Sequence, residues 1–259
     1  MGSDDNRPSR LTFKTFLQLY IRSFFIQGSF SVKYRQNLGF AFCMEPVGKI
    51  LFEDPEQYKT FLIRHLDYYN GNPFMVTLVL GAVAKMEEML CCNEGVTGND
   101  IYRFKKAVSP ATGSVGDRFF WSTLRPFGII LVLFAAVFWG FWCVLILLAA
   151  FTLPTFVLRW YWLKTGYMLG TGVISEIKNR KLESVAHFME ILNAVLIAFL
   201  TATKVALPDS SISWFSLTAA VLFVMSFFLL KRAVSKTLVL LFSLGIVIIS
   251  GIVLSFVVY

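Results

Sequence analysis

The feature that most constrains the fold is a run of 27 residues without a charge, residues 127–153. A helix of about 20 apolar residues is long enough to cross the hydrocarbon core of a bilayer. In a soluble domain, a helix that is apolar on all sides has to be buried entirely. We therefore expect an integral membrane protein in which this run is a spanning helix, ended or kinked by Pro154. Charged residues make up 15% of the chain, against about 25% in soluble domains.

Further apolar runs follow toward the C-terminus. Residues 213–230 and 237–259 are uncharged, and residues 184–207 contain Glu190, Asn193 and Lys204. Because of these polar residues, the run 184–207 suits either a polar spanning helix or a helix in the membrane interface. The sequence predicts an all-α integral membrane protein with about four spanning helices in a transmembrane region, residues 127–259.

Basic residues gather on either side of the 184–207 and 213–230 runs: Arg159, Lys164, Lys178, Arg180, Lys181, Lys231, Arg232 and Lys236. By the positive-inside rule, both groups belong to cytoplasmic loops. The chain between them then crosses the membrane twice, which supports 184–207 as a span and places the C-terminus outside. Topology and attraction to lipid headgroups thus explain the net charge of +8, and no nucleic-acid partner is expected.

The N-terminal part differs in character. Residues 1–10 are polar and predict a disordered tail without a signal peptide. Residues 11–126 alternate short apolar stretches with polar turns, which predicts amphipathic and re-entrant helices. Residues 11–30 suit an interfacial helix with a broad aromatic face, and residues 74–84 are too short to span.

Turn and cap signals divide this region further. Asp54 followed by Pro55 predicts a helix start, and residues 70–73 predict a break. Residues 109–117 are rich in Pro and Gly and predict a loop. In a membrane, irregular backbone is tolerated only where it lines a cavity or is buried in protein. Residues 11–126 are therefore the expected location of a binding site. Farther along, the spacing of Gly166 and Gly170 is typical of close helix contact.

Three ordered blocks resemble the IID component of the mannose/fructose/sorbose type of bacterial phosphotransferase system. They cover residues 22–46, residues 64–88 and residues 110–126. The residues that carry the likeness include Arg22, Gln27, Gly28, Gln36, Gly39, Pro46, Arg64, His65, Asp67, Asn70, Asn72, Pro73, Gly81, Glu87, Glu88, Pro110, Gly113, Gly116, Asp117, Trp121, Arg125 and Pro126. The likeness extends to about residue 170, and beyond that only the hydropathy is similar.

The resemblance implies a multi-pass subunit of the bacterial cytoplasmic membrane without a catalytic or phosphoaccepting residue. IID proteins pair with a IIC membrane subunit, and the two form a hetero-oligomeric pathway for a hexose. Cytoplasmic IIA and IIB relay phosphate, and IIB phosphorylates the arriving sugar. No cofactor or metal is expected.

Sugar hydroxyls require hydrogen-bond acceptors and amides, and an aromatic ring can stack on the apolar face of the sugar. The residues predicted to bind substrate are Gln27, Asn70, Glu87, Glu88, Asp117 and Trp121. The residues predicted to support this site are His65, Pro73, Gly113, Gly116 and Arg125.

Each prediction has a structural alternative. Asp117 suits a helix cap before Arg118, or an ion pair with Arg118 or Arg125. Glu87 and Glu88 suit a solvated helix end, Asn70 a turn, and His65 a structural hydrogen bond to the backbone. For the whole chain, the alternative is a non-transporting membrane sensor or scaffold. Changes from the family pattern at Ser109 and Arg118, and a shortened C-terminal region, suggest this alternative.

Overall fold

A computed structural model of the chain describes residues 10–139, 143–178, 184–193 and 196. The chain divides into two compact units, residues 1–189 and 190–259, and the fold described below is that of the first. The described residues are helical, with only isolated β-bridges at Ser31–Arg35 and Arg35–Tyr69. For them, the all-α prediction is confirmed. The tail up to residue 9, the runs 213–230 and 237–259, and most of 184–207 lie outside the described residues.

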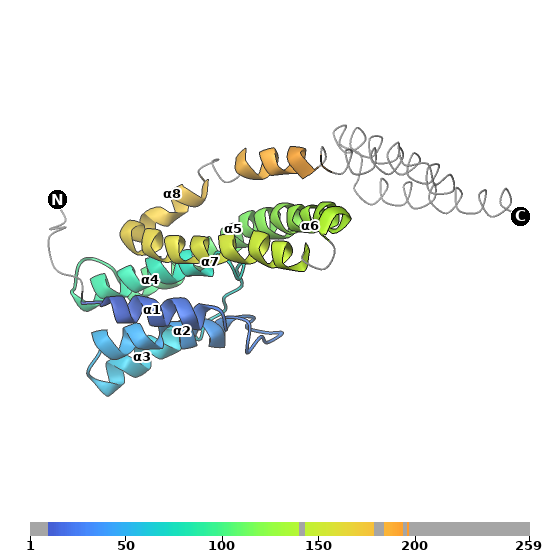
Figure 1. Ribbon diagram of the computed structural model, residues 1–259. Coiled ribbons are helices and arrows are strands. Elements are labelled where there is room, and N and C mark those ends of the chain that lie inside the picture. The colour runs from blue at the N-terminus through green and yellow to red at the C-terminus, as the bar shows by residue number, and fades with distance from the viewer. Residues whose placement is uncertain (1–9, 140–142, 179–183, 194–195, 197–259) are drawn as a thin grey trace, which may run out of the picture. The chain divides into compact units, whose positions relative to one another are not determined.

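Eight α-helices are bounded within the described residues, with a π-helix and a 3₁₀-helix between them (Figure 1). They are α1 Phe13–Ser23, α2 Asn37–Leu51, α3 Pro55–His65, α4 Val76–Cys91, α5 Gly98–Gly116, the π-helix η1 Asp117–Leu124, α6 Arg125–Trp139, α7 Cys143–Leu169, the 3₁₀-helix η3 Gly170–Gly172 and α8 Val173–Lys178. In the part of the chain that the structure describes, no helix is both long and apolar enough for a membrane crossing.

Helix α4 is the centre of the unit and packs against α1, α2, α5 and α7. Its residues are buried almost without interruption up to Glu88. The closest contact is with α7, where two glycines bring the backbones together. A Cβ atom added to Gly81 would lie 2.2 Å from the Leu163 oxygen, and one added to Gly166 would lie 2.0 Å from the Leu78 oxygen. The close contact predicted at Gly166 is therefore present. Gly170 has a positive φ of 53° and follows the end of α7.

The prediction of one spanning helix at residues 127–153 is wrong. The run is divided between α6 and α7, which pack side by side as a hairpin (Figure 1). Residues 140–142, between the two helices, lie outside the described residues. Helix α6 has 15 residues, fewer than the about 20 that a crossing needs. Pro154 does not end the helix but lies inside α7.

Two of the basic residues assigned to a loop are also placed differently. Arg159 and Lys164 lie within α7, and the Arg159 side chain is buried. The sequence did not reveal that the uncharged run is divided into two helices, because hydropathy indicates an apolar environment and not the direction of the chain.

The loop predicted at residues 109–117 is instead helical. Helix α5 extends through Pro110 to Gly116 and continues as η1 and then α6. Pro126 has no N–H to donate to the carbonyl four residues before it, and irregular turns are common at such positions. The widened turn is visible in the hydrogen bond of Thr123 Oγ1 to the oxygen of Arg118, five residues back, at 2.9 Å. The composition change near residue 126 therefore marks no break in the backbone.

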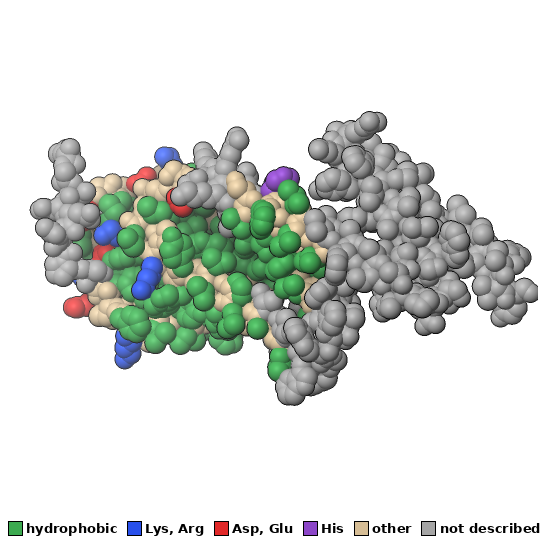
Figure 2. Space-filling model, turned by 45° about the horizontal axis from the view of Figure 1, so that its top comes forward, with side chains coloured by type: hydrophobic (Ala, Val, Ile, Leu, Met, Phe, Trp, Pro, Cys, Tyr) green, Lys and Arg blue, Asp and Glu red, His purple; other side chains and the backbone are tan. Residues whose placement is uncertain are grey.

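Helix α1 is shorter than the 11–30 segment predicted and ends at Ser23. Its buried side consists of Thr15, Leu19 and Ser23, whereas Phe13 is 69% exposed. The aromatic side of α1 is therefore divided: Phe13 lies on the molecular surface, and Phe16 and Tyr20 pack against the core. Figure 2 shows hydrophobic side chains over most of one face of the described residues.

The local signals before α3 and α4 are confirmed. Asp54 accepts a hydrogen bond from the Gln57 backbone N–H at 3.0 Å, and Pro55 is the first residue of α3. Residues 70–73 are not helical, and α4 begins at Val76. Helix α4 continues past the predicted end at Lys85 and Glu88 to Cys91.

Candidate functional site

The candidate site lies where the segment before α4 meets the junction of α5 and η1. Asn72 is buried, and its Nδ2 donates to Asp117 Oδ1 at 2.8 Å. Its Oδ1 accepts from the backbone N–H groups of Phe74 at 2.9 Å and Met75 at 3.3 Å. Asn72 therefore fixes the turn that precedes α4 and orients the Asp117 carboxylate at the same time. Among the predicted site residues Asn72 was missing, although it lies in one of the three blocks.

Gly116 makes this contact possible. A Cβ atom added there would lie 2.4 Å from both Cβ and Cγ of Asn72. Gly113, one helical turn earlier, would place a Cβ in open space. The two glycines predicted as supports thus differ: only Gly116 is packed against the site.

Aromatic residues follow Asp117 along the helix and pack against Phe74. The ring of Phe74 stacks on Phe120 at 4.4 Å between centroids and lies 5.7 Å from Trp121. The Arg125 guanidinium lies 5.4 Å from the centroid of Trp121. Asp117 and Trp121 are exposed. No hydrogen bond within the described residues occupies Asp117 Oδ2, so this oxygen can accept from a ligand hydroxyl next to an indole face.

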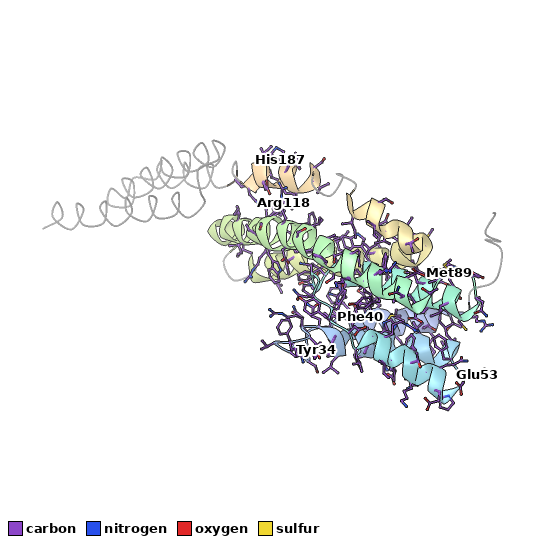
Figure 3. All side chains as sticks on the ribbon, turned by 180° about the vertical axis from the view of Figure 1, so that it is seen from behind. Tyr34, Phe40, Glu53, Met89, Arg118 and His187 are labelled. Atoms are coloured by element: carbon purple, nitrogen blue, oxygen red, sulfur yellow. The ribbon has the colours of Figure 1, made fainter. Side chains whose placement is uncertain are left out.

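Asp117 does not cap a helix that begins at Arg118, because α5 continues into η1 without interruption. Figure 3 shows Arg118 on this continuous helical segment. Asp117 lies inside a helical segment, so its carboxylate has no capping role. Its hydrogen bond to a buried amide instead gives the carboxylate a defined orientation.

Glu87 lies in a different environment, a buried ion pair. Both of its oxygens accept from Arg64, from Nε and Nη2 at 2.8 Å each, and His65 Nε2 lies 3.0 Å from Oε1. Glu87 and His65 are both fully buried. The alternative of a solvated helix end therefore does not apply to Glu87. The structural contact of His65 is with this carboxylate, where a backbone partner was expected.

Burial also changes the titration of the basic groups here. It lowers the pKa of His65 to about 4, although the neighbouring Glu87 acts in the opposite direction. It lowers the pKa of the Lys105 ammonium to about 8. The His65 imidazole is consequently neutral at pH 7, and Arg64 supplies the charge that Glu87 requires.

Glu88 faces other elements. Its Oε1 accepts from the Arg10 backbone N–H at 2.7 Å, and its Oε2 accepts from the Tyr167 hydroxyl. Lys85 Nζ lies 3.7 Å from the same oxygen. Glu88 is buried as well, so it links the N-terminal segment, α4 and α7.

The segment 69–72 is fixed by side chains from two other elements. Ser109 Oγ accepts from the Asn70 N–H at 3.0 Å and donates to the Asn70 oxygen at 2.5 Å. The Gln36 amide makes a pair of 3.1 Å hydrogen bonds with the backbone of Gly71. The side chain of Asn70 is exposed. Gln27 is exposed after α1, and among the described residues no hydrogen bond joins it to the Asn72–Asp117 pair.

Arg159 holds the same segment from α7. Its Nη1 donates to the oxygen of Pro73 and its Nη2 to Ser23 Oγ, both at 2.7 Å. Its guanidinium also lies 4.3 Å over the ring of Phe24. Pro73, predicted as a support, takes part through its carbonyl. A single cation inside an otherwise apolar run was the signal that could have identified Arg159, because a buried ionisable residue needs a partner.

Comparison with known proteins assigns the chain to a family. A family model described as "PTS system mannose/fructose/sorbose family IID component" matches residues 10–258. The match therefore continues well past residue 170, where the resemblance in motifs ends.

Two similar relatives come from different bacteria. The fructose permease IID component of Bacillus subtilis (strain 168) is 29% identical over 206 residues, which are 78% of this chain and 74% of that protein. The mannose-specific EIID component of Escherichia coli (strain K12) is 28% identical over 184 residues, 71% of this chain and 65% of that protein.

Two solved structures share the fold. One is a membrane protein with a TM-score of 0.71 and 22% identity, covering 95% of this chain and 98% of that one. The other belongs to a cryo-EM complex of the mannose transporter ManYZ with microcin E492, with a TM-score of 0.60 and 22% identity over 94% and 97% of the two chains. The fold is thus that of known membrane proteins.

Proposed function

The chain belongs to the IID components of the mannose/fructose/sorbose phosphotransferase systems, and from this premise we propose that it is a sugar-translocating membrane subunit. With a IIC partner it forms the pathway of a hexose across the bacterial cytoplasmic membrane. Transport is coupled to phosphorylation of the sugar by IIB, which receives its phosphate from IIA. The chain itself contributes binding and positioning residues and no phosphoacceptor.

The observation that carries the site assignment is the hydrogen bond between buried Asn72 and exposed Asp117. It leaves the other carboxylate oxygen of Asp117 without a hydrogen bond among the described residues, so this oxygen can accept from a ligand hydroxyl. A carboxylate that accepts from sugar hydroxyls and an indole that stacks on the ring are a suitable pair for a hexose. We therefore assign sugar contact to Asp117 and Trp121, with Asn72 and Gly116 as positioning residues.

Four other residues were predicted to bind substrate: Gln27, Asn70, Glu87 and Glu88. The carboxylates of Glu87 and Glu88 are engaged with Arg64 and Tyr167, so we assign them to holding α3 and α7 against α4. Sugar contact by Gln27 and Asn70 stays a prediction, and a IIC partner would have to complete a site around them.

The partner is tested first, by affinity purification of the tagged chain from membranes in a mild detergent. We expect a IIC-type protein in nearly equal amount. Recovery of the chain alone, or only with soluble phosphocarriers, would contradict the permease assignment and favour a sensor or scaffold.

The site is tested by Asp117→Asn, which keeps the size of the side chain and removes its charge. We expect hexose uptake to fall at least tenfold while the complex with IIC stays intact. Glu53→Gln is the matched control, because Glu53 lies in the turn before α3, far from Arg118 in Figure 3. Uptake that is unchanged in Asp117→Asn would rule out the assigned site.

A further inference from the structure

A pocket lies apart from the Asn72–Asp117 pair and shares no residue with it. It measures about 350 Å³ and opens between α5 and the turns that precede α2 and follow α3. Its lining residues are Tyr34, Asp67, Tyr68, Tyr102, Lys105 and Lys106. Ligand pockets usually measure about 300–1,000 Å³, so this one is of a size for a single-ring molecule.

A buried ammonium group forms part of the pocket. The Lys105 side chain is only 2% exposed, and its Nζ donates to the Arg64 oxygen at 3.0 Å and lies 4.8 Å over the ring of Phe40. An ammonium has three donors, and the Arg64 carbonyl uses one. In Figure 3, Tyr34 lies at the edge of the molecule and Phe40 farther inside.

The other lining residues add a second positive charge, aromatic rings with hydroxyl groups, and a carboxylate. Lys106 is exposed and adds a second positive charge, with its Nζ 5.7 Å over the Tyr102 ring. The exposed tyrosines Tyr34, Tyr68 and Tyr102 provide ring faces and hydroxyl donors. Asp67 is the acid among the lining residues and can accept from ligand hydroxyl groups.

We propose that this pocket binds a small phosphorylated polyol. The ammonium groups of Lys105 and Lys106, with tyrosine hydroxyls, take the phosphate, because lysine binds phosphate as a compact charge. The tyrosine faces cover the ring, and the Asp67 carboxylate accepts from a ring hydroxyl. A neutral polyol would leave the charge of the two lysines only partly balanced, because Asp67 is the single acid among the lining residues. A bare phosphate would make no contact with the tyrosine rings or with Asp67.

The proposal does not depend on transport, and its test measures binding alone. The full-length chain, purified in detergent, is titrated calorimetrically with glucose 6-phosphate, glucose and inorganic phosphate. We expect glucose 6-phosphate to bind at least tenfold more tightly than either of the other two. Equal binding of glucose, equal binding of inorganic phosphate, or no binding of glucose 6-phosphate would each overturn the assignment.

Exposed variants keep the test independent of folding, since Lys105 is too buried to replace safely. Lys106→Gln and Tyr68→Phe should each weaken binding of glucose 6-phosphate at least fivefold. Lys59→Gln is the control, because Lys59 is an exposed lysine of α3 outside the pocket, paired with Glu56. Unchanged affinity in both pocket variants, or an equal loss in the control, would also overturn the proposal.

Discussion

Gly116 determines how closely Asn72 can approach α5. A methyl group at this position would lie within 2.4 Å of the Asn72 side chain, so Gly116→Ala must displace the amide from Asp117. Overpacking of this kind costs about 1–3 kcal/mol. We expect Gly116→Ala to lower the free energy of unfolding by this amount and to reduce hexose uptake.

Gly113→Ala is the control for this substitution. Both glycines lie in α5, but a Cβ at Gly113 meets nothing within 4 Å. Replacing a helical glycine by alanine then stabilises by about 0.5–1 kcal/mol. A similar loss in both variants would mean that the helix tolerates no change at all, and would refute the specific role of Gly116.

His65 should make the stability of the unit depend on pH. Its pKa is lowered from 6.5 to about 4 in the folded protein, so between these values the unfolded chain binds more protons. The free energy of unfolding therefore falls as the pH is lowered from 6.5 toward 4, by up to about 3 kcal/mol. Unfolding measured across this range should lose most of its pH dependence in His65→Gln.

The chain contains 2 His, and the second supplies the control. His187 is exposed, so His187→Gln should retain the pH dependence of the unmodified chain. An equal slope in His65→Gln and in the unmodified chain would show that other groups control the response to acid.

At the scale of elements, the contact between α4 and α7 is the most extensive among the described helices. In Gly166→Ala the new methyl group would lie 2.0 Å from the Leu78 oxygen, and a backbone atom cannot rotate away. The helices have to separate, at a cost of at least about 1–3 kcal/mol. Thermal unfolding in detergent should show this loss for Gly166→Ala. Met168→Ala, at a highly exposed position of α7, should stay within about 0.5 kcal/mol.

The sequence predicted those elements whose signals are local. The Asp54 cap, Pro55 and the break at residues 70–73 act within a few residues, and all three are present. The continuous segment from α5 through η1 to α6 was not predicted, because Pro110 and its glycines are poor helix formers in isolation. Packing against α4 overrides that local preference, and single-sequence patterns carry no information about such packing.

For the molecule as a whole, the site depends on contacts between distant parts of the chain. Arg159 reaches the Pro73 carbonyl across 86 residues, and Asn72 reaches Asp117 across 45. Sequence motifs predicted Asp117, Pro73 and Gly116 for the candidate site. The hydrogen-bond partners of Asn72 and Arg159 could not be predicted, although Arg159 stands out as a cation in an apolar run, because these contacts form only once α7 and α5 lie against the segment before α4.

The exposed apolar face allows a prediction about the environment of the whole unit. This face is formed by α1, the residue after it and α7: Phe13 contacts Trp160, and Phe24 contacts Phe156. Val157 of α7 is 67% exposed. Large apolar faces of this kind mark contact with lipid or with another protein. We expect Val157 to face lipid acyl chains when the protein is in a bilayer.

Spin labels can distinguish these environments. A label at Val157→Cys in liposomes, in a background with the native cysteines replaced by serine, should collide more often with oxygen than with a water-soluble nickel chelate. A label at Thr60→Cys should show the opposite, because Thr60 is an exposed polar residue of α3. If Val157→Cys favours the nickel chelate, the face is in water. If neither reagent reaches it, a protein partner covers the face. Either result would contradict the lipid assignment, because only acyl chains concentrate oxygen and exclude the chelate.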